Sequence, residues 1–131
     1  MKVRGAWFAA AIAGLAWCAD APARAETMGV FTKSAGNPIA RSVRAGAEAV
    51  AKANGITVFH YIPTSPDNVP QQTFLVDEAL NAKRDAIVFT PVDVKAMVPA
   101  VQRINAANVA LVNVGDRLTG GAAVAFIGSD D

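Results

Sequence analysis

The sequence predicts an α/β fold, a doubly wound parallel sheet with the element order βαβαβαββ. Short apolar, β-branched runs alternate with longer segments whose apolar residues recur with a helical period. The connections between them are rich in Gly, Pro, Asn and Asp, which favour turns. The run Ala-Ile-Val-Phe at 86–89 has no polar residue, which is typical of a central parallel strand covered on both faces.

The expected elements follow one another from residue 28 to residue 127. Asn37 and Pro38 are suited to begin the first helix, because Asn is a preferred N-cap and Pro fits the first turn. Gly55 is placed to end this helix. Pro99 interrupts the third helical segment, so either that helix kinks or a first turn precedes a helix that starts near Pro99. The expected strands are 28–32, 56–62, 86–89, 109–114 and 123–127, and the expected helices are 37–54, 69–83 and 94–104.

The helical segments have apolar faces that we expect to pack on the sheet. Charged residues occupy another face of the first helix, and we interpret them as a solvated face: Arg41, Arg44, Glu48 and Lys52. The candidate buried residues of this helix are Ile39, Val43, Ala47, Val50 and Ala51. Those of the second helix are Phe74, Leu75, Val76, Ala79 and Leu80, and those of the third are Val94, Met97, Val98, Val101 and Ile104.

Residues 1–25 have the organisation of a secretory signal peptide. Lys2 and Arg4 form a short positive region, and the run at 5–19 carries no charge. Ala23-Arg24-Ala25 supplies a small-x-small cleavage site, so we expect cleavage after Ala25. Rival sites end at Ala21 and Ala23. The apolar run is shorter than the roughly 20 residues of a membrane span, and an uncleaved membrane anchor is the alternative.

Cleavage after Ala25 would leave residues 26–131, the size of one small domain. Cys18 is the only cysteine of the chain and lies in the leader, so the mature chain would have no disulfide or thiolate site. This suits an oxidising compartment such as a bacterial periplasm. The mature chain would carry nine Lys and Arg against ten Asp and Glu. It lacks the clustered basic face that nucleic-acid binding requires.

Three expected loops share the carboxyl edge of the sheet, where open α/β sheets bind ligands. Their amide, carboxylate and guanidinium groups suit a small polar ligand with many hydroxyls. For Asn37 and Asp93 the alternative role is a helix cap, and for Asp116 and Arg117 it is a surface turn. The polar side chains of the three loops are Lys33, Ser34, Asn37, Thr90, Asp93, Asp116 and Arg117.

The sequence shows no catalytic constellation. His60 is the only histidine and lies in an expected strand, so it has no second histidine with which to bind a metal. Neither G-x-G-x-x-G nor the Walker pattern occurs, since the first loop holds a single glycine, Gly36. We therefore expect no catalytic residue, metal or cofactor. A small secreted α/β enzyme is the alternative class.

A set of short motifs carries a family resemblance. They are Met28-Gly-Val-Phe-Thr-Lys-Ser-Ala-Gly-Asn-Pro38, Asp85-Ala-Ile-Val-Phe-Thr-Pro-Val-Asp93, Val109-Ala-Leu-Val-Asn-Val114 and Phe126-Ile-Gly-Ser-Asp130. In this order they resemble the type I periplasmic binding proteins, the ribose-binding-like solute receptors of ABC transporters, which are related to LacI-type repressors. The signal peptide favours the secreted receptor. The resemblance implies a sugar- or polyol-binding protein of the periplasm, whose partner is an inner-membrane ABC permease.

The resemblance also implies ligand contacts from two loops. Asn37 matches the family's Asn before Pro, and Lys33 falls where a small polar contact residue is common. Asp116 and Arg117 match an acidic-or-amide plus Arg pair after the fourth strand. A one-residue shift would instead make Gly115 and Asp116 the matching pair.

The chain departs from the family in two respects. Many sugar binders have two aromatic residues after the Asn-Pro, where this chain has Ile39 and Ala40, so the ligand class stays open. The family has two lobes with the ligand between them, and residues 26–131 correspond to the first lobe only. We therefore interpret the chain as a truncated N-terminal lobe. A non-functional remnant and a lobe that signals to a chemoreceptor are the alternatives.

Overall fold

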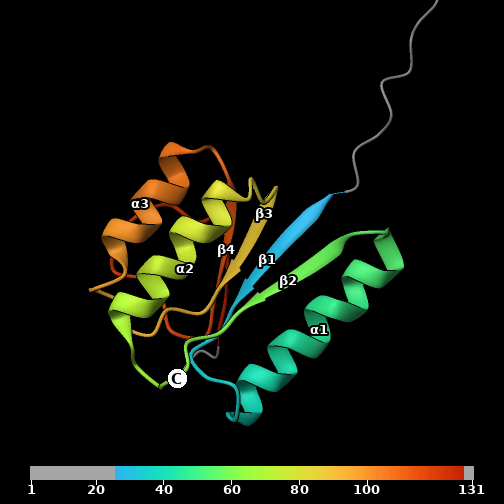
Figure 1. Ribbon diagram of the computed structural model, residues 1–131, viewed down its shortest axis with the longest axis horizontal. Helices are drawn as coiled ribbons and strands as arrows, with labels where there is room; N and C mark the ends of the chain where they lie inside the picture. The colour runs from blue at the N-terminus through green and yellow to red at the C-terminus, as the bar shows by residue number, and fades with distance from the viewer. Residues whose placement is uncertain (1–25, 129–131) are drawn as a thin grey trace, which may run out of the picture.

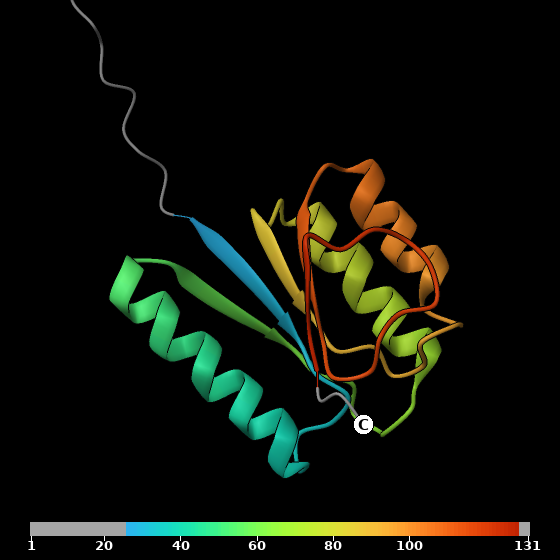
Figure 2. The same cartoon turned by 180° about the vertical axis from the view of Figure 1, so that it is seen from behind.

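The computed structural model describes residues 26–128 and confirms the predicted α/β fold. Five strands form one all-parallel sheet in the order β2-β1-β3-β4-β5. Helix α1 lies on one face of the sheet, and α2 and α3 lie together on the other (Figures 1 and 2). The strands are β1 (Thr27–Phe31), β2 (Thr57–Tyr61), β3 (Ala86–Phe89), β4 (Ala110–Val114) and β5 (Ala125–Ile127), and the helices are α1 (Pro38–Asn54), α2 (Val69–Asn81) and α3 (Val98–Ala106).

The ends of the helices follow the local sequence signals. The Asn37 side chain accepts hydrogen bonds from the backbone N–H groups of Ile39 and Ala40 and so caps α1. Gly55 ends α1 with φ at 69°, a left-handed conformation that glycine adopts without steric cost. At Pro99 the second alternative is correct, because a separate turn precedes α3 and Pro99 occupies its first turn. The predicted signal peptide lies outside the described residues, and no helix within 26–128 is long and apolar enough to cross a bilayer.

The main core lies between the sheet and the pair α2 and α3. Phe31 of β1 stacks on Tyr61 of β2, with ring centroids 4.6 Å apart, and packs against Phe89 of β3. Gly29 leaves room for this stack, since a Cβ there would lie 3.2 Å from the Tyr61 ring. The fully buried core residues are Phe31, Val76, Ala79, Ile87, Phe89, Met97, Ala100, Val101, Ile104 and Leu111. The apolar stripe predicted for α2 is partly wrong, because Phe74 is exposed and Gln72 is buried.

The face of the sheet that carries α1 is only partly covered. Helix α1 packs over β1 and β2, and a groove of about 380 Å³ lies beside it, lined by Met28, Ser42, Val43, Gly46, Ala47, Val50, Val88, Val112, Val114 and Ile127. Burial in β3 therefore alternates, with Ile87 buried and Val88 half-buried. The prediction of a central parallel strand is correct, but one of its two faces is only partly covered. On α1 itself, Ile39 and Val50 are 70% and 60% exposed although both belong to the predicted apolar face.

Candidate functional site

Three loops meet at the carboxyl edge of the sheet. Loop 1 (32–37) follows β1, loop 2 (90–93) follows β3 and loop 3 (115–118) follows β4. Because these three strands are neighbours and parallel, their carboxyl ends lie side by side. Together with the start of α1 and the end of β4, the loops line a cavity of about 140 Å³, here called the carboxyl-edge pocket. Its lining residues are Lys33, Asn37, Ile39, Ala40, Val43, Thr90, Val114, Gly115 and Asp116.

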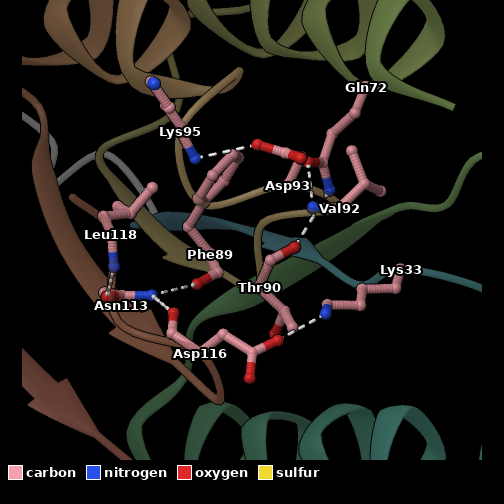
Figure 3. Close-up of polar contacts among 10 residues, drawn as sticks. All are labelled: Lys33, Gln72, Phe89, Thr90, Val92, Asp93, Lys95, Asn113, Asp116 and Leu118. Atoms are coloured by element: carbon pink, nitrogen blue, oxygen red, sulfur yellow. Dashed lines mark hydrogen bonds and ion pairs between the residues drawn. The ribbon is translucent and has the colours of Figure 1, made fainter. Parts of the chain in front are cut away.

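An ion pair joins loop 1 to loop 3 at this pocket. Lys33 Nζ donates to Asp116 Oδ2 at 2.5 Å, and Figure 3 shows the two side chains reaching toward each other beside Thr90. The side chains are 32% and 61% exposed, so water screens their attraction and the pair contributes little to folding. An ammonium and a carboxylate in this position can donate to and accept from a ligand hydroxyl.

Asn37 has a structural role and also free donors. Its Oδ1 accepts from the N–H of Ile39 at 2.8 Å, so the cap alternative is correct for the oxygen. Its Nδ2 donates no hydrogen bond to the residues that the structure describes, and the side chain lines the carboxyl-edge pocket. The cap orients the amide, and the two N–H groups are available to a ligand.

Thr90 presents the most unusual polar atom of the pocket. Its Oγ1 is buried and has no hydrogen-bond partner within residues 26–128. A buried hydroxyl without a partner costs about 1–3 kcal/mol, and such a group in a native fold calls for an explanation. Gly115 adopts a φ of 84° next to it, where a Cβ would lie 3.4 Å from the Thr90 methyl group. The sequence placed Thr90 at the edge but did not single it out.

Asp93 does not line the carboxyl-edge pocket. Its Oδ1 accepts from the backbone N–H of Lys95 at 2.9 Å (Figure 3) and from that of Ala96 at 2.6 Å, and so caps the turn before α3. The hydrogen bond from Ala96, followed by that from Lys95, holds the pKa of this carboxyl below its usual value. The cap alternative is therefore the one the structure shows.

Arg117 lies apart from the other expected contact residues. Its guanidinium sits over the ring of Phe126, 3.8 Å from the centroid. It lines a different cavity, of about 220 Å³, together with residues 120–123. The structure thus brings Lys33, Asn37 and Asp116 together but leaves Arg117 outside their pocket. Gly115 and Asp116 both line the pocket.

Two amide side chains that sequence reasoning missed hold loops 2 and 3. Gln72 of α2 donates to the Thr90 carbonyl at 3.0 Å and accepts from the Val92 N–H at 2.9 Å. Asn113 of β4 donates to the Asp116 carbonyl and accepts from the Leu118 N–H, both at 3.0 Å (Figure 3). The available signal was a polar amide inside an otherwise apolar segment, because buried polar groups require partners.

The sequence interpretation of Arg44 as part of a solvated face is wrong. Its guanidinium donates to three oxygen atoms of loop 1, those of the Thr32 hydroxyl and of the Ser34 and Ala35 carbonyls. The side chains of Glu48 and His60 are in hydrogen-bond contact at 2.7 Å on the α1 side of the sheet, and neither lines the pocket. Within residues 26–128, no three His, Cys, Asp or Glu side chains gather in a way that could hold a metal ion.

Comparison with known families decides the classification. Residues 28–131 match the family described as a periplasmic binding protein domain. The chain belongs to this family. A search of curated protein sequences finds no significant match.

Solved structures of periplasmic binding proteins share the fold. A carbohydrate transporter solute binding protein from Agrobacterium radiobacter, in complex with D-arabinose, is 22% identical with a TM-score of 0.77, over 82% of this chain and 36% of that chain. An ABC transporter periplasmic solute binding protein from Actinobacillus succinogenes 130z, with bound D-allose, is 29% identical with a TM-score of 0.68, over 72% and 33%. This periplasmic binding protein chain therefore spans about a third of the length of these structures. Both structures are named as solute-binding proteins of transport systems.

Proposed function

We propose that residues 26–131 form the N-terminal lobe of a solute-binding protein that delivers a sugar or polyol to an ABC permease of the inner membrane. Family membership supports the transport role. The names of the similar structures, which include complexes with D-allose and D-arabinose, support a polyhydroxylated ligand. In this proposal residues 1–25 are a signal peptide cleaved after Ala25, and the mature protein acts in the periplasm.

The observation that carries the proposal is the set of polar groups at one pocket. Thr90 offers a buried hydroxyl with no partner among the described residues, and Asn37 offers two free N–H donors. Lys33 and Asp116 add one donor group and one acceptor group. The two charges already neutralise each other, so the pocket favours a neutral ligand with alternating hydroxyls over an anion.

The pocket is smaller than a complete small-molecule binding site. Cavities that hold a small molecule usually measure about 300–1,000 Å³, and this one measures about 140 Å³. Relatives two to three times as long have the additional chain to supply the opposing wall. We therefore expect the isolated lobe to bind only weakly. A micromolar dissociation constant for it in isothermal titration would contradict this expectation.

Arg117 remains a proposed contact of the complete site. It would have to leave the Phe126 ring, and an exposed cation–π contact of this kind is worth about 0.5–1 kcal/mol. A hydrogen bond from the Arg117 guanidinium to a ligand hydroxyl would supply enough free energy to compensate for the loss of that contact.

The test of the binding site is an NMR titration of the secreted chain with D-arabinose, D-allose and glycerol at millimolar concentrations. We expect amide shifts that saturate at Lys33, Asn37, Thr90 and Asp116. Asp116→Asn should weaken binding about tenfold, because hydrogen bonds to charged groups contribute about 1.5–3 kcal/mol. The control is Glu78→Gln, an exposed acid of α2. No shift with any polyol, or shifts confined to other loops, would refute the site.

The leader is tested separately by the intact mass of the chain secreted by a bacterial host. Cleavage after Ala25 leaves Glu26 as the first residue. Retention of residues 1–25 would instead favour the membrane anchor.

A further inference from the structure

One guanidinium holds most of loop 1. Arg44 Nη1 donates to the Thr32 hydroxyl at 3.0 Å and to the Ser34 carbonyl at 3.2 Å, and its Nη2 donates to the Ala35 carbonyl at 2.8 Å. These acceptors belong to three of the first four residues of the loop. Loop 1 has no helix or strand ladder of its own, so its carbonyls depend on such partners.

The contacts enclose the residue that reaches the pocket. Lys33 lies between Thr32 and Ser34, both of which Arg44 contacts. At the other end of the loop, Asn37 is fixed because it caps α1. With the backbone held at both ends, the Lys33 side chain extends over the pocket to Asp116, as Figure 3 shows. Arg44 itself does not line the pocket.

Loops 2 and 3 are held in a comparable way. Gln72 bonds the backbone of loop 2 and Asn113 bonds the backbone of loop 3, each from outside the loop. Each of the three loops that line the pocket thus has one polar side chain that fixes its backbone. A site whose loops are ordered before the ligand arrives loses less entropy on binding.

We propose that Arg44 is a positioning residue of the carboxyl-edge pocket, which orders loop 1 so that Lys33 and Asn37 face the ligand. The expected effect of Arg44 on affinity rests on the proposed function, whereas its expected effect on the order of loop 1 does not. It depends on the planar fork of the guanidinium, which reaches three acceptors at once. A lysine ammonium is a single point of contact and cannot replace it.

The chain offers a matched control on the same helix. Arg41 lies one turn before Arg44, is exposed, and makes no side-chain hydrogen bond with residues 26–128. Arg41→Met removes the same charge from α1 as Arg44→Met and leaves loop 1 untouched. Arg44→Lys keeps the charge and removes the fork, and it provides a second variant if Arg44→Met folds poorly.

The experiment measures backbone ¹⁵N order parameters of the full secreted chain. In the wild type and in Arg41→Met, we expect residues 33–36 to be ordered like the strands, with order parameters of about 0.85. In Arg44→Met and Arg44→Lys they should fall toward ~0.6 or below, while the β-sheet amides keep their values. Unchanged order parameters at residues 33–36 in the Arg44 variants would overturn the proposal. An equal fall in the order parameters of the sheet would also overturn it, because that result indicates general destabilisation.

The affinity for D-arabinose, titrated by NMR, provides the second measurement. It should fall at least about threefold in both Arg44 variants and stay unchanged in Arg41→Met. If no variant binds any sugar, the proposed function fails, yet the order parameters still decide the role of Arg44. Lower order parameters in loop 1 with an unchanged affinity for D-arabinose would contradict the proposal that Arg44 positions the ligand contacts.

Discussion

The two faces of the sheet are built from similar residues but are covered to different degrees. On the face of α2 and α3, Ile87, Phe89 and Leu111 are fully buried under two helices. On the face of α1, Val88 and Val112 are half-buried and border an open groove. Both faces follow the apolar pattern of a parallel strand, and only one of them forms a complete core.

The difference shows that apolar pattern and burial are separate properties. The sequence of a strand or helix predicts which side chains share a face, because side chains repeat every 2 residues along a strand and every 3.6 residues along a helix. Whether that face is covered depends on how many helices pack on it. The substitutions below test the contrast between the faces, from the largest expected effect to the smallest.

The strongest contrast compares one valine from a helix on each face. Val76→Gln in α2 should cost about 3 kcal/mol or more, since the site is fully buried and has no partner for an amide. Val50→Gln in α1 should change stability by less than about 0.5 kcal/mol, because Val50 is 60% exposed. Urea unfolding measures both. A large loss of unfolding free energy in Val50→Gln would indicate that the Val50 side of α1 is buried in solution.

Two neighbours in β3 provide the contrast within one strand. Ile87→Ala should cost about 2–5 kcal/mol, the range for a large core residue. Val88→Ala should cost about 1 kcal/mol, because each buried methylene is worth about 0.8 kcal/mol and Val88 is only half-buried. The measurement is the urea midpoint at constant slope. Equal losses of unfolding free energy in the two variants would show that both faces of β3 are buried to the same degree.

An exposed pair with an acidic partner can be compared on each face, and for these two pairs we expect equal effects on stability. Glu48 contacts His60 at 2.7 Å on the α1 face, and Asp77 contacts Arg103 at 3.0 Å between α2 and α3. The acids are 60% and 50% exposed, so Glu48→Gln and Asp77→Asn should each cost about 0.2–1 kcal/mol. Thermal unfolding at low and high salt checks this. A much larger loss in one variant would mean that its pair is shielded from water.

The smallest expected effect is the pH response of the turn that leads into α3. Hydrogen bonds from Ala96 and Lys95 lower the pKa of Asp93 in the folded state. The stabilisation by this carboxylate is complete above the usual pKa of 3.8 and is lost as the pH falls through the lowered folded value. Asp93→Asn should therefore show a smaller fall in Tm between pH 7 and pH 3 than the wild type. Identical falls would show that the cap does not couple to folding.

Much of the fold could be predicted because its signals are local. The order of strands and helices, the Asn37 cap and the left-handed Gly55 follow from neighbouring residues. Element ends were less accurate, since α2 ends at Asn81, not at 83, and β5 begins at Ala125, not at 123. The missed buried polar residues, Gln72 and Asn113, become buried only through contacts with loops distant in the sequence.

The candidate site divides in the same way. The three edge loops could be located, because parallel strands place their carboxyl ends together. That Lys33 meets Asp116 across 83 residues could not be predicted, nor that Arg117 turns to Phe126. Arg44 looked like one more solvent-facing charge, because its acceptors lie on loop backbone that a periodicity analysis does not place.

The sequence by itself determined the alternating elements, the caps and the polar composition of the edge loops, since each of these depends on residues within a few positions of one another. Only the tertiary structure decided the strand order β2-β1-β3-β4-β5, which brings loops 1, 2 and 3 around one pocket. It also decided that one face of the sheet is fully covered and the other only partly covered. The physical reason is that burial and loop contacts come from packing between distant segments, which no local period encodes.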